Sequence, residues 1–224
     1  MMTILLLLCY DASYMKKKII VLIVTTLIII GLTFLMWPIR LIDNLYIRRG
    51  LTILLYLLLC ATALVACKLT SIKIDIELNN YWQFIIGLII ACTLSLGIAF
   101  IPALLGHSLI GNHQDFDIGE LLFYLFFYLV IVGPIEELIF REYYQDTFCE
   151  FFKNNKWIGV VIAAALFGLW HLINGSLLQV LFTFGIGLVF GLGKHFIKKF
   201  KYLGGSFGHG LYDFLNVIVR MFVI

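Results

Sequence analysis

Long apolar runs separated by short polar segments fill this chain from end to end. A helix needs about 20 apolar residues to cross a bilayer, and the runs reach this length repeatedly. No connecting segment is long enough to form a soluble domain. The pattern therefore predicts an all-α polytopic membrane bundle of about seven transmembrane helices, at residues 19–37, 51–67, 81–105, 118–134, 157–173, 177–193 and 202–224. Beyond the fourth span, the chain continues as an apolar-acidic helix over residues 135–152.

Composition supports a membrane protein. Hydrophobic residues make up 62% of the 224 positions and charged residues only 13%, which is far from the usage of soluble domains. The formal net charge of +3 is too small to indicate a nucleic-acid partner. The expected partner is the lipid bilayer itself, and the sequence carries no signal for an oligomeric state.

The charges also predict an orientation and a division into three parts. Most lysines and arginines fall on one side if Lys16–Lys18 lie inside, which favours a cytoplasmic N-terminus. Residues 1–18 form an N-terminal extension in which Met15 is an alternative start, residues 19–105 hold three spans, and residues 117–224 hold the rest. Polar residues that are candidates for chemistry occur in this last part, among its four helices.

The first candidate cluster lies at Pro134-Ile-Glu136-Glu137, with Arg141 one turn further on. Pro134 cannot donate a backbone hydrogen bond and favours a helix start or a kink. Glu137 and Arg141 are four positions apart, so on a helix they share a face and can form an ion pair. Glu136 points about 100° away and stays available as a general base. Alternatively, the acids mark the membrane–water interface and Arg141 faces lipid headgroups.

The second cluster is Phe167-Gly-Leu-Trp-His171, near the end of an otherwise apolar span. A lone histidine in such a helix often forms a hydrogen bond to a neighbouring helix. It can also act on a water molecule if a carboxylate comes close. Phe167, one turn earlier, would either line the pocket of such a site or only pack against neighbouring helices. Both interpretations stay open, because no acidic residue lies near His171 in the sequence.

The third cluster combines the glycine-rich stretch 204–210 with His209 and Asp213. The two polar residues are four apart and share a helix face. The glycines allow either a close approach of helices or a loop that enters the bilayer. The alternative is that His209 and Asp213 only satisfy each other at a helix junction.

The three clusters can form one site only if their residues lie at a similar depth in the membrane. At about 1.5 Å per residue, His171 and His209 would lie about 21 Å and 10 Å from the cytoplasmic ends of their spans. A shared site therefore needs tilted helices, or a fourth span that continues past Pro134 and places Glu136 near mid-membrane. We expect the second arrangement, because aromatic residues keep an apolar face beyond the proline.

Taken in order, E-E-x-x-x-R, F-x-x-x-H and H-x-x-x-D on successive helices resemble the CPBP intramembrane protease family. This family, also called Abi or CAAX protease and bacteriocin-processing, includes the Rce1-type prenyl-protein proteases. The resemblance covers about residues 117–218. It implies a catalytic set of five residues, namely Glu136, Glu137, His171, His209 and Asp213. Arg141 and Phe167 would support this set. The family commonly has Asn or Asp at the position of Asp213.

The implied function is an intramembrane endopeptidase that cleaves a membrane-associated peptide or protein near its end. In the expected mechanism, Glu136 takes a proton from water that His171 holds. His209, oriented by Asp213, stabilises the oxyanion, and Glu137 preorganises the site with Arg141. A divalent metal such as zinc on His171 and His209 and a metal-free mechanism fit equally well, since the chain has no H-E-x-x-H helix.

Two other functions are compatible with the same residues. One is a bacteriocin self-immunity membrane protein of the same fold, and the other is a small transporter that uses the intramembrane acids as an ion path. The substrate stays open between prenylated C-terminal peptides, bacteriocin or pheromone precursors and other membrane-anchored proteins. Short loops and a composition rich in Ile, Leu, Phe and Lys favour a multi-pass protein of a bacterial plasma membrane.

Overall fold

The computed structural model describes residues 2–173 and 176–224, with side chains for 14–172 and 176–224. This part of the chain is helical and contains no strand, which confirms the predicted all-α class. It divides into two compact units, Met1–Lys73 and Ile74–Ile224. Each unit is described by itself.

The first unit is a helical hairpin. Its helices are α1 (Met2–Phe34), α2 (Met36–Arg40) and α3 (Leu45–Thr70). The Asn44 side chain accepts hydrogen bonds from the first turn of α3 and so caps that helix. At the other end of the hairpin, Tyr14 Oη donates to the carbonyl of Thr70 at 3.1 Å. Residues 2–18 form the first half of α1, in one helix with the first predicted span.

The second unit contains two long composite helices and three further ones. The first composite helix joins α4 (Trp82–Ser95), η1 (Leu96–Phe100) and α5 (Ile101–Leu104). The second joins α6 (Ile118–Phe126), η2 (Phe127–Val132), α7 (Gly133–Glu137), η3 (Leu138–Gln145) and α8 (Asp146–Phe151). The remaining elements are α9 (Lys156–Trp170), which ends in the short turn η4 (His171–Ile173), α10 (Leu177–Phe196) and α11 (Tyr202–Phe222).

Five helices in the described chain are long and apolar enough to cross a membrane. They are Tyr14–Arg40, Leu45–Thr70, Trp82–Leu104, Ile118–Phe151 and Leu177–Phe196. The helix α9 is apolar but shorter, and α11 carries the polar residues of the third motif. The seven predicted spans thus correspond to five long apolar helices and these two, as a multi-pass membrane bundle requires.

The helix Ile118–Phe151 passes Pro134 without a break, as expected. Pro134 cannot donate to the helical ladder, and the turns before it, in η2, are π-helical. Such wider turns commonly relieve a disrupted ladder and are frequent at functional sites. The carbonyl of Pro134 accepts a hydrogen bond from Tyr202 Oη at 3.0 Å. Because the helix continues, Glu136 and Glu137 lie near its middle.

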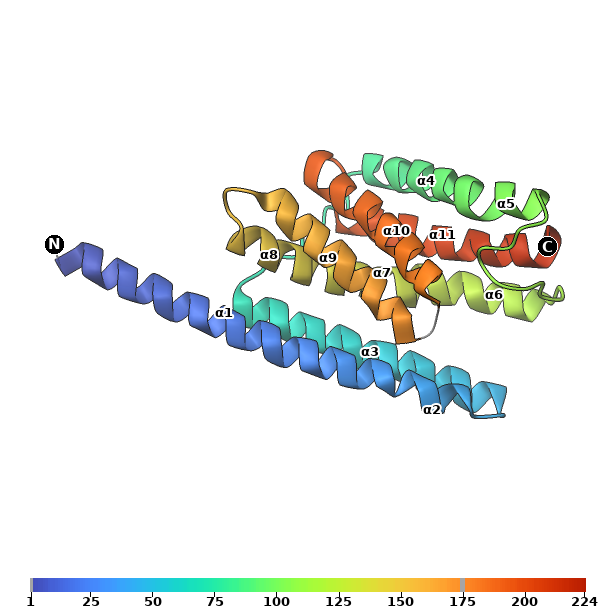
Figure 1. Cartoon of the computed structure of the whole chain (residues 1–224), viewed down its shortest axis with the longest axis horizontal. Helices are drawn as coiled ribbons and strands as arrows, with labels where there is room; N and C mark the ends of the chain where they lie inside the picture. Colours follow the sequence, from blue (N-terminus) through green and yellow to red (C-terminus); the bar gives the residue numbers. More distant parts are fainter. Residues whose placement is uncertain (1, 174–175) are drawn as a thin grey trace. The chain divides into compact units, whose positions relative to one another are not determined.

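In the second unit, α11 packs between α4 on one side and η2 with α7 on the other (Figure 1). Glycines bring the backbones together on both sides. A Cβ on Gly87 of α4 would lie 2.5 Å from the Gly204 carbonyl, and a Cβ on Gly133 would lie 2.5 Å from the Ser206 carbonyl. The glycine-rich stretch therefore forms a helix that two neighbours approach closely. The predicted alternative, a loop that enters the bilayer, is not observed.

The first turn of α11 is also held by a side chain of α4. Gln83 is fully buried, and its Oε1 accepts a hydrogen bond from the backbone N–H of Gly204 at 3.1 Å. Its Nε2 donates to the carbonyl of Glu77 at 2.6 Å. The helix start would otherwise leave this N–H unsatisfied in an apolar setting. The contact fixes the register of α11 and therefore the position of its polar residues.

Candidate active site

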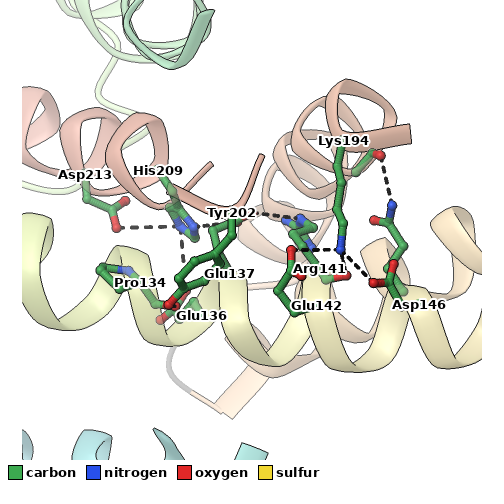
Figure 2. Close-up of polar contacts among 12 residues, drawn as sticks. Pro134, Glu136, Glu137, Arg141, Glu142, Asp146, Lys194, Tyr202, His209 and Asp213 are labelled. Atoms are coloured by element: carbon green, nitrogen blue, oxygen red, sulfur yellow. Dashed lines mark hydrogen bonds and ion pairs between the residues drawn. The ribbon is translucent and has the colours of Figure 1, made fainter. Parts of the chain in front are cut away.

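His209 lies at the centre of a cluster of carboxylates (Figure 2). Its Nδ1 is 3.0 Å from Glu137 Oε1, and its Nε2 is 3.6 Å from Glu136 Oε2 and 3.8 Å from Asp213 Oδ2. The glutamates come from α7, and His209 and Asp213 come from α11. Glu136, Glu137 and His209 are each at most 3% exposed. The structure therefore brings the first and third sequence motifs together in one buried site.

The contacts of His209 define what each ring nitrogen can do. An ionised carboxylate only accepts hydrogen bonds, so Nδ1 is the donor in the contact with Glu137. This contact fixes the orientation of the ring. As a result Nε2 faces the carboxylates of Glu136 and Asp213. The shortest contact of the imidazole is with Glu137, whereas the sequence assigned its orientation to Asp213.

The other oxygen of Glu137 faces the guanidinium of Arg141. Arg141 Nε lies 3.5 Å from Glu137 Oε2, so the predicted ion pair between residues four apart is present. Arg141 is 2% exposed, and its three nitrogens have no hydrogen-bond partner in the described part of the chain. Its guanidinium carbon lies 4.9 Å from the centre of the Phe167 ring, a favourable cation–π distance. The buried charge is thus compensated by one carboxylate and one aromatic face.

Phe167 links the second motif to this cluster. Its ring packs edge-to-face against His209, with centroids 5.4 Å apart, and against His171 at 4.8 Å. It is 1% exposed, so it separates the two imidazoles as a packed wall. Phe190 lies on the other side of His209 at 5.5 Å. The aromatic rings exclude other rotamers of His209 and therefore keep Nε2 directed at the acids.

His171 closes α9 and presents one nitrogen for chemistry. Its Nδ1 lies 2.9 Å from the carbonyl of Phe167. A carbonyl oxygen only accepts, so Nδ1 carries the proton and Nε2 of the neutral ring has a lone pair. Among the described residues, His171 forms no direct hydrogen bond with the carboxylate cluster. It joins the site through Phe167 and through a cavity that it shares with Asp213.

This cavity has a volume of about 320 Å³. His171 and Asp213 lie in its wall, so it reaches the carboxylate cluster. The apolar part of the wall comes mainly from η1, α10 and the segment after α5. Polar side chains also line it, namely Tyr128, Gln179, Thr183, Tyr212, Asn216 and Arg220. A concave space with convergent polar groups beside a buried charged cluster is a candidate ligand site.

Sequence reasoning did not single out these polar cavity residues. Asp213, Asn216 and Arg220 lie at spacings of three and four on α11, which places them along one face of that helix. That spacing of polar residues in an apolar helix is a signal that could have found them. Tyr128 gives no such signal, because its neighbours in η2 are aromatic or aliphatic.

A second charged cluster lies further along the same long helix (Figure 2). Lys194 of α10 is 2.8 Å from Glu142 Oε1 and 3.0 Å from Asp146 Oδ2. Its Nζ also donates to the carbonyl of Arg141 at 2.7 Å. Glu142 is 1% exposed, so this is a buried charge set. It ties the end of α10 to the turn that carries Arg141.

The segment before α4 joins the same end of the unit. Lys201 Nζ lies 2.5 Å from Asp75 Oδ2, and the hydrogen bond to Asp75 raises the pKa of Lys201 above that of a free lysine. Asn80 donates to the carbonyl of Lys199 at 2.9 Å. Segments predicted to share one side of the membrane therefore lie together. Their assignment to the cytoplasm stays a prediction.

The donor set does not match a metal centre. No group of three or more His, Cys, Asp or Glu side chains in the described chain is placed to hold a metal ion. His209 directs Nδ1 at Glu137, and His171 directs Nδ1 at a backbone carbonyl and lies beyond the Phe167 ring. The predicted zinc ligands His171 and His209 thus belong to no such ligand group, and no step below uses a metal.

Paired glutamates, an imidazole and a third carboxylate thus lie together inside an apolar helical bundle. Comparison with family models identifies residues 118–215 with the type II CAAX prenyl endopeptidase Rce1-like family. This region contains both glutamates, both histidines and Asp213. The match supports an Rce1-like assignment of the C-terminal helices and, at the level of that family, an intramembrane endopeptidase activity. Comparisons with curated proteins and with solved structures found no match.

Proposed function

We propose that this protein hydrolyses a peptide bond of a membrane-associated substrate with a water molecule activated by Glu136. One observation carries the proposal. A single buried imidazole contacts Glu136, Glu137 and Asp213, and this cluster opens through Asp213 onto a cavity large enough for part of a peptide. Ionisable groups inside a membrane protein are costly and usually functional, and these groups are the ones that water activation requires.

In the first step, Glu136 accepts a proton from water as the water oxygen bonds to the substrate carbonyl carbon. Nε2 of His171 has a lone pair, because Nδ1 donates to the Phe167 carbonyl. It can accept the second water hydrogen and so aim the water at the carbonyl. General-base catalysis of this kind contributes roughly 10²- to 10⁴-fold in rate.

The tetrahedral oxyanion then forms beside His209. Glu137 holds Nδ1 at 3.0 Å, so Nε2 is the nitrogen that can donate to the oxyanion when the ring carries two protons. The aromatic rings of Phe167 and Phe190 pack against the imidazole and keep it in place during the reaction. A fixed donor in a water-poor site stabilises developing negative charge more than a mobile one does.

In the last step, the carbon–nitrogen bond breaks and the electron pair leaves with the amine nitrogen. Glu136 returns its proton to that nitrogen, so the enzyme regains its starting state. The products are a carboxylic acid and an amine, which become a carboxylate and an ammonium ion when the acid proton passes to the amine. Arg141 and Glu137 keep their ion pair throughout and hold the helix turn on which Glu136 lies.

Comparative peptidomics of native cells tests this proposal. One strain would carry the natural chain, a second Glu136→Gln and a third Asp115→Asn. Gln replaces the carboxylate of Glu136 with an amide of the same shape, and Asp115 is a fully exposed carboxylate outside the cluster. We expect new peptide termini in the natural and Asp115→Asn strains that are absent from the Glu136→Gln strain.

Matched abundance of the three proteins in the membrane is the control for folding. Identical peptide profiles in all three strains would contradict the hydrolase. That result would favour the bacteriocin-immunity function, and a bacteriocin challenge of the same strains would then be the next measurement.

A further inference from the structure

We propose that Arg220 forms a carboxylate-binding subsite in the wall of the cavity, two helical turns from Asp213. This inference rests on the proposed function, since it concerns the peptide that would occupy the same cavity. The substrate would carry a negatively charged carboxylate group about 10 Å from the bond that is cleaved.

Arg220 is a cation in the wall of a partly apolar cavity. It lies near the end of α11 and is half-buried, but its Nε is buried without a hydrogen-bond partner in the described chain. Among the side chains that the structure describes, no carboxylate lies within ion-pair distance of Arg220. An uncompensated guanidinium is costly inside a helical bundle. A ligand with a negative charge would remove this cost.

Two other cations of the second unit, Arg141 and Lys194, behave differently. Arg141 forms an ion pair with Glu137, and Lys194 forms ion pairs with Glu142 and Asp146. Asp213 also lines the cavity, but its ion-pair contact is with His209 at 3.8 Å. Arg220 is therefore the cation whose charge faces the cavity without an acidic partner from the described chain.

The surroundings of Arg220 suit a carboxylate. Tyr128 and Asn216 line the same cavity, and a phenol hydroxyl and an amide can both donate hydrogen bonds. The planar guanidinium fits a carboxylate with two parallel hydrogen bonds. Gly111, with φ of +112°, lets the loop after α5 approach the Arg220 side chain. Leu109, Ile110 and Gly111 of that loop form part of the cavity wall.

The helix sets the distance between this subsite and the reacting groups. Asp213 and Arg220 are seven residues apart on α11, which is two turns and about 10 Å along the axis. Both line the cavity, so a ligand in it can meet both at once. An acidic group on the peptide at that distance would place the substrate carbonyl near Glu136 and His209, and so select where the chain is cut.

Binding to the full chain in lipid nanodiscs tests the subsite without requiring cleavage. The probes are labelled pools of random apolar nine-residue peptides made from Ala, Val, Leu, Ile and Phe. One pool has free C-terminal carboxylates and a second is C-amidated. A third is amidated and carries one Glu at a random position. Glu136→Gln protein is used for retention, so that bound peptides are not consumed.

We expect the acidic pools to be retained roughly 10- to 100-fold better than the neutral pool, as for a charge-assisted hydrogen-bonded pair. Arg220→Gln in the same background should remove this preference, and Arg220→Lys should restore part of it. Lys198→Gln, at an exposed lysine outside the cavity, should leave it unchanged. The first and third pools separate a C-terminal carboxylate from an acidic side chain as the recognised group.

Equal retention of acidic and neutral pools, including no retention of either, would overturn the subsite. A preference that survives Arg220→Gln would do the same. A misfolded variant would lose all pools equally, and the neutral pool reveals this. Cleavage by the natural protein is measured separately, so a failure of the proposed hydrolysis and a failure of the subsite give different results.

Discussion

Glu137 accepts a hydrogen bond from His209 across 72 positions of sequence, at 3.0 Å between Oε1 and Nδ1. Its second oxygen pairs with Arg141 at 3.5 Å. One carboxylate therefore ties a motif residue of α11 to the helix turn that carries Glu136. In the proposed mechanism, Glu137 positions the site while Glu136 reacts with water.

Replacing Glu137 with Gln should lower the rate of peptide hydrolysis about 10- to 100-fold. The amide can donate as well as accept, so it no longer fixes which nitrogen of His209 carries the proton. Because the substrate cavity is untouched, KM should change little and kcat should carry the loss. Steady-state kinetics on a substrate found by peptidomics would measure both. Full kcat in this variant would contradict a positioning role for Glu137.

Removing Arg141 alone should destabilise the protein strongly. Arg141→Met leaves the Glu137 carboxylate buried without its cation, which costs about 3–5 kcal/mol in comparable buried pairs. The double variant Glu137→Gln/Arg141→Met should be more stable than Arg141→Met, because it removes the stranded charge as well. Unfolding in mixed micelles would measure the difference. Additive losses for the two changes would show that the ion pair does not couple these residues.

Helix contacts through glycine give a third prediction. Gly210→Ala should destabilise the protein by about 1–3 kcal/mol, because the new Cβ would overlap the Tyr128 backbone carbonyl. It should also lower activity, since it pushes His209 away from the glutamates. Gly185→Ala is the matched control, as nothing lies within 4 Å of that position. It should be neutral or stabilise by up to about 1 kcal/mol. Similar losses in both variants would argue against close packing as the cause.

Sequence patterns predicted the parts of this fold that depend on residues close together in the chain. The ion pair of Glu137 with Arg141 follows from helical spacing and is present at 3.5 Å. The continuation of the helix past Pro134 followed from the apolar face beyond it, and the structure shows it. The apolar runs likewise predicted the helical class, because helix length and hydrophobicity are local properties.

Contacts between distant elements could not be predicted in the same way. The bond from His209 to Glu137, the capping of Gly204 by Gln83 and the cavity at Arg220 all depend on how closely α11 approaches its neighbours. The glycines indicated a close approach but did not specify a partner helix or a register. In the sequence, Lys194 was only one of the positive charges that predict the membrane orientation. The structure places it beside the turn that carries Arg141.

The two charged pairs at the end of the second unit should differ in strength. Lys194→Met strands Glu142, which is 1% exposed, and should cost about 3–5 kcal/mol. Lys201→Met removes a pair whose partner Asp75 is 47% exposed, and should cost no more than about 1 kcal/mol. Unfolding measurements under identical conditions would compare them. A Lys201→Met loss as large as that of Lys194→Met would contradict the importance of burial.

The position of α11 along the chain has a consequence for biosynthesis. A ribosome completes Glu136 and Glu137 well before it reaches His209, and α11 enters the membrane after every other described helix. Until α11 packs between α4 and α7, no imidazole lies beside Glu136 and Glu137. The cavity also lacks the helix that carries Asp213. The proposed catalytic set is therefore incomplete until α11, the last described helix to be synthesised, has packed against α7.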